Sequence, residues 1–352
     1  MRAYFITIGA ALLLLGCASA PNPTPTATPT AAPTATPTAA PTATPTAAPT
    51  ATPTAAPTAA PTAAPTAPPT ATPPPAADQY VANPVEFVDA ADWDSAETVT
   101  VTLSEFAFTP NDIVFEAGKP YIIKVVNAGT VKHEFTAGAF FRTVAQRKAE
   151  TAESEVKVPY FTEIEVFAGK TVDLYLIPLI PGTYDLLCEI EGHFEAGMFG
   201  TITVTGETPA VPALQLADVA SGPWVQDGQA LVDAADWDAA GLLTIELSEF
   251  AFTPSEMALA AGQPYIITVT NVGTVKHEFT AEDFFGTVAF RKAEDASGEF
   301  KAPAPREVEV FPGKSIDLYL IPTADGTYDL VCEIEGHFEA GMFGTITVAA
   351  AD

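Results

Sequence analysis

The chain has 352 residues and a formal net charge of −29 at neutral pH, from 44 acidic and 15 basic side chains. Nucleic acids and bare anionic lipid surfaces bind clusters of Lys and Arg, so this charge argues against nucleic acid as a partner. A basic protein partner suits the surface, although an acidic surface also serves solubility alone. Of the three cysteines, Cys17 lies in the leader, and Cys188 and Cys332 are too few for a disulfide framework.

The first residues are typical of an export signal. Arg2 supplies a positive charge, and the apolar stretch that runs from Tyr4 to Leu15 is short for a membrane span. The next residues, Leu-Leu-Gly-Cys ending at Cys17, resemble the bacterial lipoprotein signal, in which the peptide is cut before an acylated cysteine. We therefore predict a signal peptide with lipidated Cys17 at 1–17, and a lipid anchor that holds the protein outside the cytoplasm, on the periplasmic or outer face of the bacterial cell membrane. The alternative is an ordinary signal peptide cut after Ala20.

Pro, Thr and Ala dominate residues 21–77, and a segment with so few large apolar side chains cannot build a core. Proline at this density favours the extended polyproline II form. The composition therefore predicts a disordered tether at 18–77.

The rest of the chain contains an internal duplication. The segment Ser-Glu-Phe-Ala-Phe-Thr-Pro that begins at Ser104 returns 144 positions later at Ser248, and the run 188–204 recurs unchanged at 332–348 with the same offset. The duplication predicts two domains, at 78–205 and 224–352, joined by a linker at 206–223.

Within each unit the periodicity is that of strands. Apolar and polar residues alternate at 98–103 and 171–176, and β-branched residues fill 121–126. Only 140–153, with several basic and amide side chains, has a helical pattern. The pattern predicts an all-β protein made of two tandem β-sandwiches, each with a short helical insertion.

All four histidines, and both cysteines outside the leader, fall into two sets with equal spacing. In each set a His follows a strand that ends at Asn, and a later run has the spacing Cys-x4-His-x4-Met. A thiolate, two imidazoles and a thioether are the ligands of a trigonal copper site with a weak axial Met. The candidate ligands are His133, Cys188, His193 and Met198 in the first unit, and His277, Cys332, His337 and Met342 in the second.

Other interpretations of these residues remain open. A buried Cys or Met is often core packing, and a disulfide between Cys188 and Cys332 is conceivable, yet neither explains the repeated spacing. Zinc also binds Cys and His, but a thioether is a poor zinc ligand.

The sequence around these residues resembles the blue copper proteins, or cupredoxins. The resemblance is carried by the first His after an Asn-containing turn, by Gly-Thr-Tyr before the Cys-x4-His-x4-Met-Gly run, and by a closing Thr-Ile-Thr-Val strand; azurin and auracyanin share the Cys-to-His spacing. It implies Greek-key sandwiches, one type 1 copper ion per unit held by the candidate ligands, and electron entry through the loop histidine. One departure is Glu134, with Glu278 in the second unit: many family members have Asn there, bracing the ligand loops, so the hydrogen bonds around the metal are in question.

The predicted function is electron transfer outside the cytoplasm without catalysis, with a redox protein as partner, such as a basic cytochrome or a membrane oxidoreductase complex. Tandem-domain oxidases and nitrite reductases need further histidines, and all four are already assigned. A copper storage or delivery protein is the alternative, although such proteins favour Met-rich or His-rich surfaces and only Met1 and Met257 lie outside the two sets. Apolar residues beside the loop histidines, including Phe194 and Phe338, form either a docking patch or part of the core.

Overall fold

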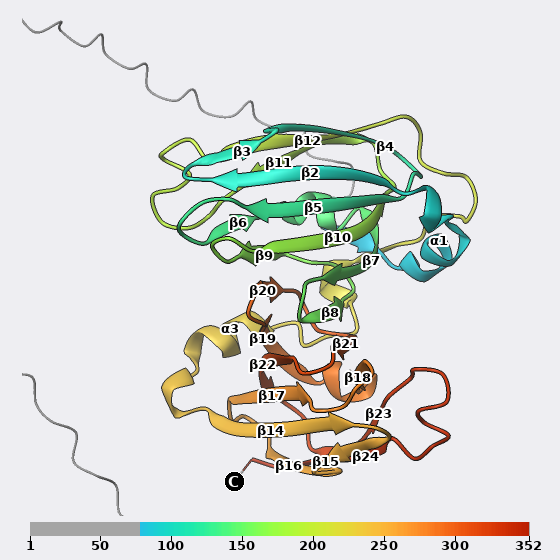
Figure 1. Ribbon diagram of the computed structural model, residues 1–352, viewed down its shortest axis with the longest axis vertical. Helices are drawn as coiled ribbons and strands as arrows, with labels where there is room; N and C mark the ends of the chain where they lie inside the picture. The colour runs from blue at the N-terminus through green and yellow to red at the C-terminus, as the bar shows by residue number, and fades with distance from the viewer. Residues whose placement is uncertain (1–77, 352) are drawn as a thin grey trace, which may run out of the picture. The chain divides into compact units, whose positions relative to one another are not determined.

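The computed structural model describes residues 78–351 (Figure 1). The predicted signal peptide, Cys17 and the whole predicted tether at 18–77 lie outside the described residues. Within the described range, no helix is long and apolar enough to cross a membrane.

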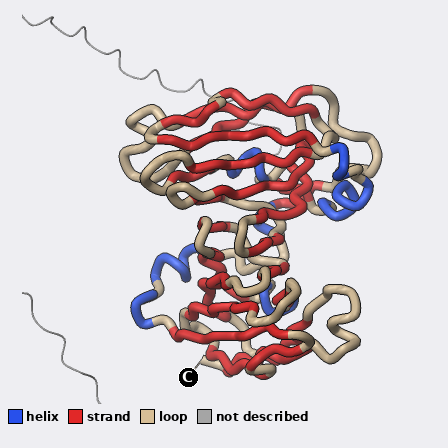
Figure 2. Tube along the Cα trace, viewed as in Figure 1, coloured by secondary structure: helices blue, strands red, loops and turns tan. Residues whose placement is uncertain are grey.

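Strands make up nearly half of the described chain and the helices are few and short, which confirms the predicted all-β class (Figure 2). The strands of the first repeat are β2 (Glu97–Ser104), β3 (Ala107–Thr109), β4 (Asp112–Glu116), β5 (Tyr121–Asn127), β6 (His133–Phe135), β7 (Val144–Glu150), β8 (Ser154–Lys157), β9 (Glu163–Val166), β10 (Thr171–Pro178), β11 (Gly182–Leu187) and β12 (Phe199–Thr205). Those of the second repeat are β14 (Gly241–Ser248), β15 (Ala251–Thr253), β16 (Glu256–Ala260), β17 (Tyr265–Asn271), β18 (His277–Thr280), β19 (Val288–Glu294), β20 (Gly298–Lys301), β21 (Glu307–Val310), β22 (Ser315–Pro322), β23 (Gly326–Val331) and β24 (Phe343–Ala349).

Each repeat is a sandwich of two layers, as predicted. In the first repeat one layer has the strand order β3-β2-β5-β10-β7, and the other holds β4-β12-β11 and the pair β6-β9, linked by a bridge between Thr136 and Leu187. Along β5, fully buried and half-buried residues alternate, as expected for a strand with one face on the core. Aromatic rings fill that core, among them Phe140 and Tyr184, which are fully buried 5.6 Å apart.

The two repeats exchange hairpins. Strand β8 of the first repeat pairs with β21 of the second, where Val156 lies opposite Val308, and β20 of the second pairs with β9 of the first, where Phe300 lies opposite Ile164. Asp295 accepts hydrogen bonds from the Thr151 and Ser154 hydroxyls of the first repeat. Each repeat therefore extends a sheet of the other.

The predicted helix over 140–153 is wrong for most of its length, because β7 pairs with β10 and β8 of the same repeat. Helix α2 covers only Gly138–Phe141, and its counterpart α4 covers Glu282–Phe285; Val144–Glu150 is strand β7. Lys148 binds Glu150 on its own strand and Glu155 across the β7-β8 hairpin, so these charges pair along two strands and not along a helix. Pairing with neighbouring strands overrides the local pattern.

Several short elements near the predicted boundaries have no clear sequence pattern. Helices α1 (Pro84–Ala90) and α3 (Gly228–Ala234) each bury only two residues, too few to show a helical period. The predicted linker at 206–223 contains strand β13 (Leu216–Asp218), which pairs with β1 (Gln79–Val81), and the 3-10 turn η2 (Val219–Ser221). The connector is therefore partly ordered by pairing with the start of the first repeat.

Candidate metal centre

The candidate ligands of the first repeat lie at the ends of three strands. His133 begins β6, Cys188 directly follows β11 and Met198 directly precedes β12. Ligand atoms of His133, Cys188 and His193 all lie within 4.8 Å of one another, and the Cys188 Sγ to His193 Nδ1 distance is 3.3 Å. His277, Cys332 and His337 form an equal group, also with 3.3 Å between sulfur and nitrogen.

Hydrogen bonds within the loop between Cys188 and Met198 close it into a compact turn. The Cys188 N–H donates to the Met198 carbonyl at 3.3 Å, and the Met198 N–H donates to the His193 carbonyl at 3.0 Å. Gly192 and Gly197 have φ of +84° and +107°, a region that favours glycine. The loop thus brings the ends of β11 and β12 together and holds His193 between them. Met198 is fully buried there.

Burial sets the protonation of the first histidine. His133 is fully buried, and neither of its ring nitrogens has a hydrogen-bond partner among the described residues. Burial lowers the pKa of His133 and the neighbouring His193 lowers it further, so the ring is neutral and can donate a lone pair to a metal. Two imidazoles and one buried sulfur form a donor set that fits a copper ion.

The sulfur of Cys188 is supported by backbone donors. Burial raises the pKa of the thiol, and the N–H groups of Glu134 and Ile190 act against that rise. The Glu134 N–H lies 3.4 Å from Sγ, and the Glu278 N–H lies 3.3 Å from the sulfur of Cys332. These donors favour the thiolate that a metal requires.

The Glu134 side chain braces the ligand loops, a role that the presence of Glu in place of Asn had put in question. Its carboxylate accepts the Glu189 N–H at 2.8 Å, which ties the strand of His133 to the loop of Cys188. Glu278 accepts the Glu333 N–H in the same way at 3.0 Å. Burial and the neighbouring Glu163 raise the pKa of Glu134 to about 7.

The hairpin turn between β2 and β3 contacts both His193 and the loop that precedes His133. Phe106 has a φ of +66°, which is rare for a residue other than glycine, and its ring meets the His193 ring edge-on at 5.1 Å. Glu105 accepts the Thr130 hydroxyl at 2.8 Å, and hydrogen bonds from Thr130 lower the pKa of Glu105 to about 2. The turn therefore clamps the loop that precedes His133 while Phe106 covers His193.

Sequence reasoning did not assign this turn to the site, although the signal was present. Ser104 to Pro110 recurs without change in the second repeat, where Phe250 has a φ of +63° and meets His337 at 5.1 Å. Strict repetition of a strained turn is a pointer to the site that it supports.

The aromatic residues around the loop histidines are at the surface. Phe194 is 39% exposed and Phe106 is 42% exposed, and Phe338 and Phe343 reach 53% and 59% in the second repeat. Of the two interpretations left open, these rings thus form an exposed patch; Ile190 and Ile334 instead pack against the core.

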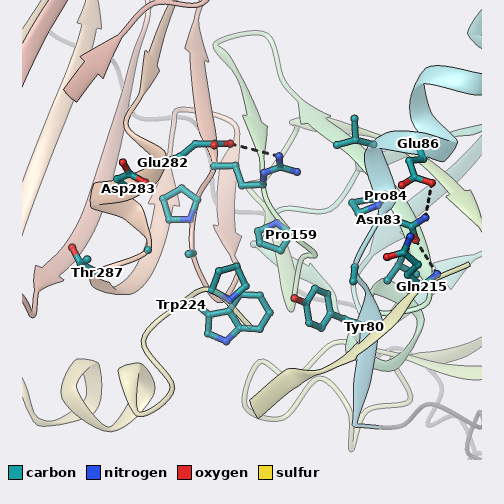
Figure 3. A pocket seen from close by; sticks show the side chains of 18 residues that line it. Tyr80, Asn83, Pro84, Glu86, Pro159, Gln215, Trp224, Glu282, Asp283 and Thr287 are labelled. Atoms are coloured by element: carbon teal, nitrogen blue, oxygen red, sulfur yellow. Dashed lines mark hydrogen bonds and ion pairs between the residues drawn. The ribbon is translucent and has the colours of Figure 1, made fainter. Parts of the chain in front are cut away.

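One pocket in the described part of the chain lies away from both metal groups. It is a pocket of about 840 Å³ with Tyr80, Trp224 and Arg306 in its wall (Figure 3). None of the eight candidate ligands lines it. The chemistry of the histidines and cysteines is therefore independent of this pocket.

The described residues thus hold two Cys-His-His groups, one on each β-sandwich, whose donor atoms fit copper binding. Residues 85–204 and 228–348, which are more than half of the chain, match the cupredoxin-like domain family. The chain belongs to that family, with two copies of its domain. The free state of Cys188 and Cys332 leaves no disulfide between them.

Individual relatives are more distant. A segment of 101 residues is 32% identical to the copper-resistant cuproprotein CopI of Rubrivivax gelatinosus, and spans 28% of this chain and 59% of that protein. Auracyanin from Roseiflexus castenholzii is 22% identical, with a TM-score of 0.24 over 32% of this chain and 98% of that one. The copper-containing nitrite reductase of Thermus scotoductus is 15% identical, with a TM-score of 0.27 over 72% of this chain and 62% of that one. Likeness at these TM-scores has no bearing on function.

Proposed function

We propose that this protein is an electron carrier outside the cytoplasm, tethered to the membrane through Cys17, with two type 1 copper sites and no catalytic activity. The observation that carries the proposal is the pair of buried His-Cys-His groups, each followed by a buried Met at the spacing of an axial ligand. When bound, copper supplies a one-electron couple between Cu(I) and Cu(II).

The residues of each site suit repeated redox cycling because they are fixed before a metal binds. Backbone hydrogen bonds close the ligand loop, Glu134 ties it to the strand of His133, and Phe106 rests against His193. A site whose ligands move little between oxidation states has a small reorganisation energy, and electron transfer is then fast. Met198, and Met342 in the second repeat, would supply the thioether ligand.

The surface around the loop histidine is the proposed place of electron entry. His193 is half-buried, beside the exposed ring of Phe194. The acidic residues Glu189, Glu191 and Glu195 are exposed on the same loop. An apolar centre with an acidic rim suits a basic redox protein such as a cytochrome, or a basic face of a membrane oxidoreductase complex, and does not suit nucleic acid.

Copper storage or delivery is the second candidate. The specific observation in its favour is the similarity to a copper-resistant cuproprotein over part of the chain. A delivery protein must release its metal, whereas a carrier must keep it in both oxidation states.

A redox cycle beside a chelator separates the two functions. We expect two copper ions per chain, an intense thiolate-to-copper visible band that reduction bleaches and oxidation fully restores, and no loss of metal to a moderate Cu(I) chelator. Transfer of copper to the chelator on reduction would instead establish delivery.

Attachment to the membrane is tested separately. Wild-type protein should enter the membrane fraction and a Cys17→Ala variant should not, because acyl chains on Cys17 supply the anchor. An unmodified mature protein that starts at Pro21, found by mass spectrometry, would contradict the lipid anchor.

A further inference from the structure

Each repeat places one lysine beside the metal centre of the other repeat. Lys301, at the end of β20, lies 2.6 Å from Glu163 of β9, measured between Nζ and Oε1. By the same duplication, Lys157 of β8 lies 2.5 Å from Glu307 of β21. Both ion pairs cross from one repeat to the other.

Strand exchange forces these contacts. In the register of β20 and β9, Lys301 lies directly opposite Glu163, and in that of β8 and β21, Lys157 lies directly opposite Glu307. Residues directly opposite in an antiparallel pair share a face of the sheet, so their side chains meet. Lys301 is about one-third exposed and Glu163 is mostly buried, which leaves this pair less screened than one on the open surface.

A short chain of side chains connects the lysine to the thiolate. Glu163 is hydrogen-bonded to Glu134, whose carboxylate accepts the Glu189 N–H and whose own N–H points at Cys188 Sγ. The second repeat repeats this chain, from Lys157 through Glu307 to Glu278 and Cys332. The positive charge of one repeat thus acts on the sulfur of the other through two carboxyl groups.

The carboxyl pair needs such a counter-charge. Two neighbouring carboxylates repel each other, and the cost grows when both are removed from water. Glu105, Glu165, Glu299 and Lys132 are further charged groups around the first site, and the Lys132 to Glu165 pair lies 2.8 Å apart. That local pair leaves Lys301 as the cation that contacts Glu163.

We propose that Lys301 and Lys157 are positioning residues that act across the domain boundary: each holds the carboxyl pair that braces the other repeat's copper site and raises that site's reduction potential. The inference rests on the copper sites of the proposed function. The sign follows because a positive charge disfavours Cu(II), the more positive oxidation state. Neither site then has its native potential without the other repeat.

Single-site versions of the full chain test the crossed assignment. In Cys332→Ser, which keeps only the first site, Lys301→Gln should reduce the Cu(I) to Cu(II) ratio at fixed ambient potential by about three- to tenfold, where tenfold is 59 mV for one electron. Lys157→Gln in the same background should leave the ratio unchanged. In Cys188→Ser the two lysines should exchange these effects.

Charge-preserving and opposite variants separate electrostatics from damage to the fold. Lys301→Arg should restore the parent ratio, and Glu163→Gln should shift the first site in the opposite direction by removing a negative charge. A shift of the site in the lysine's own repeat, of both sites equally, or of neither would overturn the proposal.

A metal-free measurement separates this inference from the proposed function. In copper-free protein, Lys301→Gln should move the NMR resonance of the Glu189 amide and leave that of Glu333 in place, because only Glu189 donates to the carboxyl pair that Lys301 contacts. Parent proteins that bind copper without a blue band would refute the type 1 sites, while unchanged amide resonances would refute the role of the lysines.

Discussion

The two repeats agree at their metal centres and differ at their surfaces. Sulfur-to-nitrogen distances are 3.3 Å in both, the paired histidine rings lie 5.0 Å apart in both, and the strained Phe meets the loop His at 5.1 Å in both. In contrast, Phe343 is 59% exposed whereas its counterpart Phe199 is only partly exposed. The metal site depends on a short loop and its hydrogen bonds, which the duplication preserved, while the exposure of the same residue beside that loop differs between the repeats.

Loss of one thiolate should give the largest difference between the two repeats, measured as bound copper and visible absorption. Cys188→Ser should remove about half of the visible band and one of two bound copper ions, since the ligand groups share no atom. Cys332→Ser is the matched variant and should remove the other half. A band that disappears completely or persists unchanged in either variant would contradict two independent sites.

Each site has a glycine packed against its first histidine, and replacing that glycine should destabilise the repeat that contains it. A Cβ added at Gly129 would lie 2.9 Å from both His133 Nε2 and Glu105 Oε1, so Gly129→Ala should destabilise the copper-free protein by about 1–3 kcal/mol. Gly273→Ala should act similarly in the second repeat, where the corresponding distances are 3.0 Å. Denaturant unfolding measures the effect.

Gly138→Ala is the control for this pair. An added Cβ there has no neighbour closer than 3.7 Å, and we expect a change within about 0.5 kcal/mol. A loss at Gly138 as large as that at Gly129 would show that these glycines matter for general packing and not for the histidine.

Much of the fold follows from local patterns, because each unit repeats the same strand periods and turns. The predicted strand at 121–126 is β5, and the predicted strand at 98–103 lies within β2. Hairpin exchange could not be predicted in this way, because the partner of β8 is β21, more than a hundred residues away, and no local pattern encodes it. The predicted helix is instead strand β7 because it pairs with β10 and β8 of the same repeat.

For the candidate site too, some features could be predicted from the sequence and others could not. The structure brings His133, Cys188 and His193 together, as the spacing predicts, although their role as copper ligands, that of Met198, and the predicted domain boundaries remain predictions. Glu134 was noticed as a departure, but its hydrogen bond to the Glu189 N–H depends on how two distant loops meet. Lys301 gave no signal, since its partner Glu163 belongs to the other repeat.

The carboxyl groups of Glu134 and Glu278 should make the stability of the two repeats depend on pH over different ranges. Burial and a neighbouring carboxylate raise the pKa of Glu134 from near 4.5 to about 7 and that of Glu278 to about 8. The folded state then holds these protons more tightly than the unfolded state, so this stabilisation is complete below pH 4.5 and is lost as pH rises through the folded pKa.

Copper-free protein and its Glu134→Gln variant test this sign. The stability of wild type relative to the variant should fall by about 2 kcal/mol between pH 4.5 and 7, and against Glu278→Gln the fall should continue to pH 8. Gln keeps an oxygen that can accept the Glu189 N–H, so the difference isolates the charge. Denaturant unfolding across this range measures it, and a difference independent of pH would contradict the raised pKa values.

The smallest expected effect concerns the two surfaces. Because the ligand loops are identical in sequence, their acidic side chains should steer a cationic cytochrome equally well, and reduction of either single-site protein should slow with a similar dependence on salt. Screening shortens the range of this attraction to about 10 Å at 0.1 M salt.

The apolar contact should differ between the two surfaces, since Phe338 is 53% exposed and Phe194 only 39%. Phe338→Ser in Cys188→Ser protein should therefore slow reduction by about two- to fivefold, and Phe194→Ser in Cys332→Ser protein by less, because more apolar area is lost at the second site. Stopped-flow reduction measures both rates; a rate that is indifferent to salt would exclude acidic steering, and a larger effect of Phe194→Ser would show that exposure does not rank the two docking surfaces.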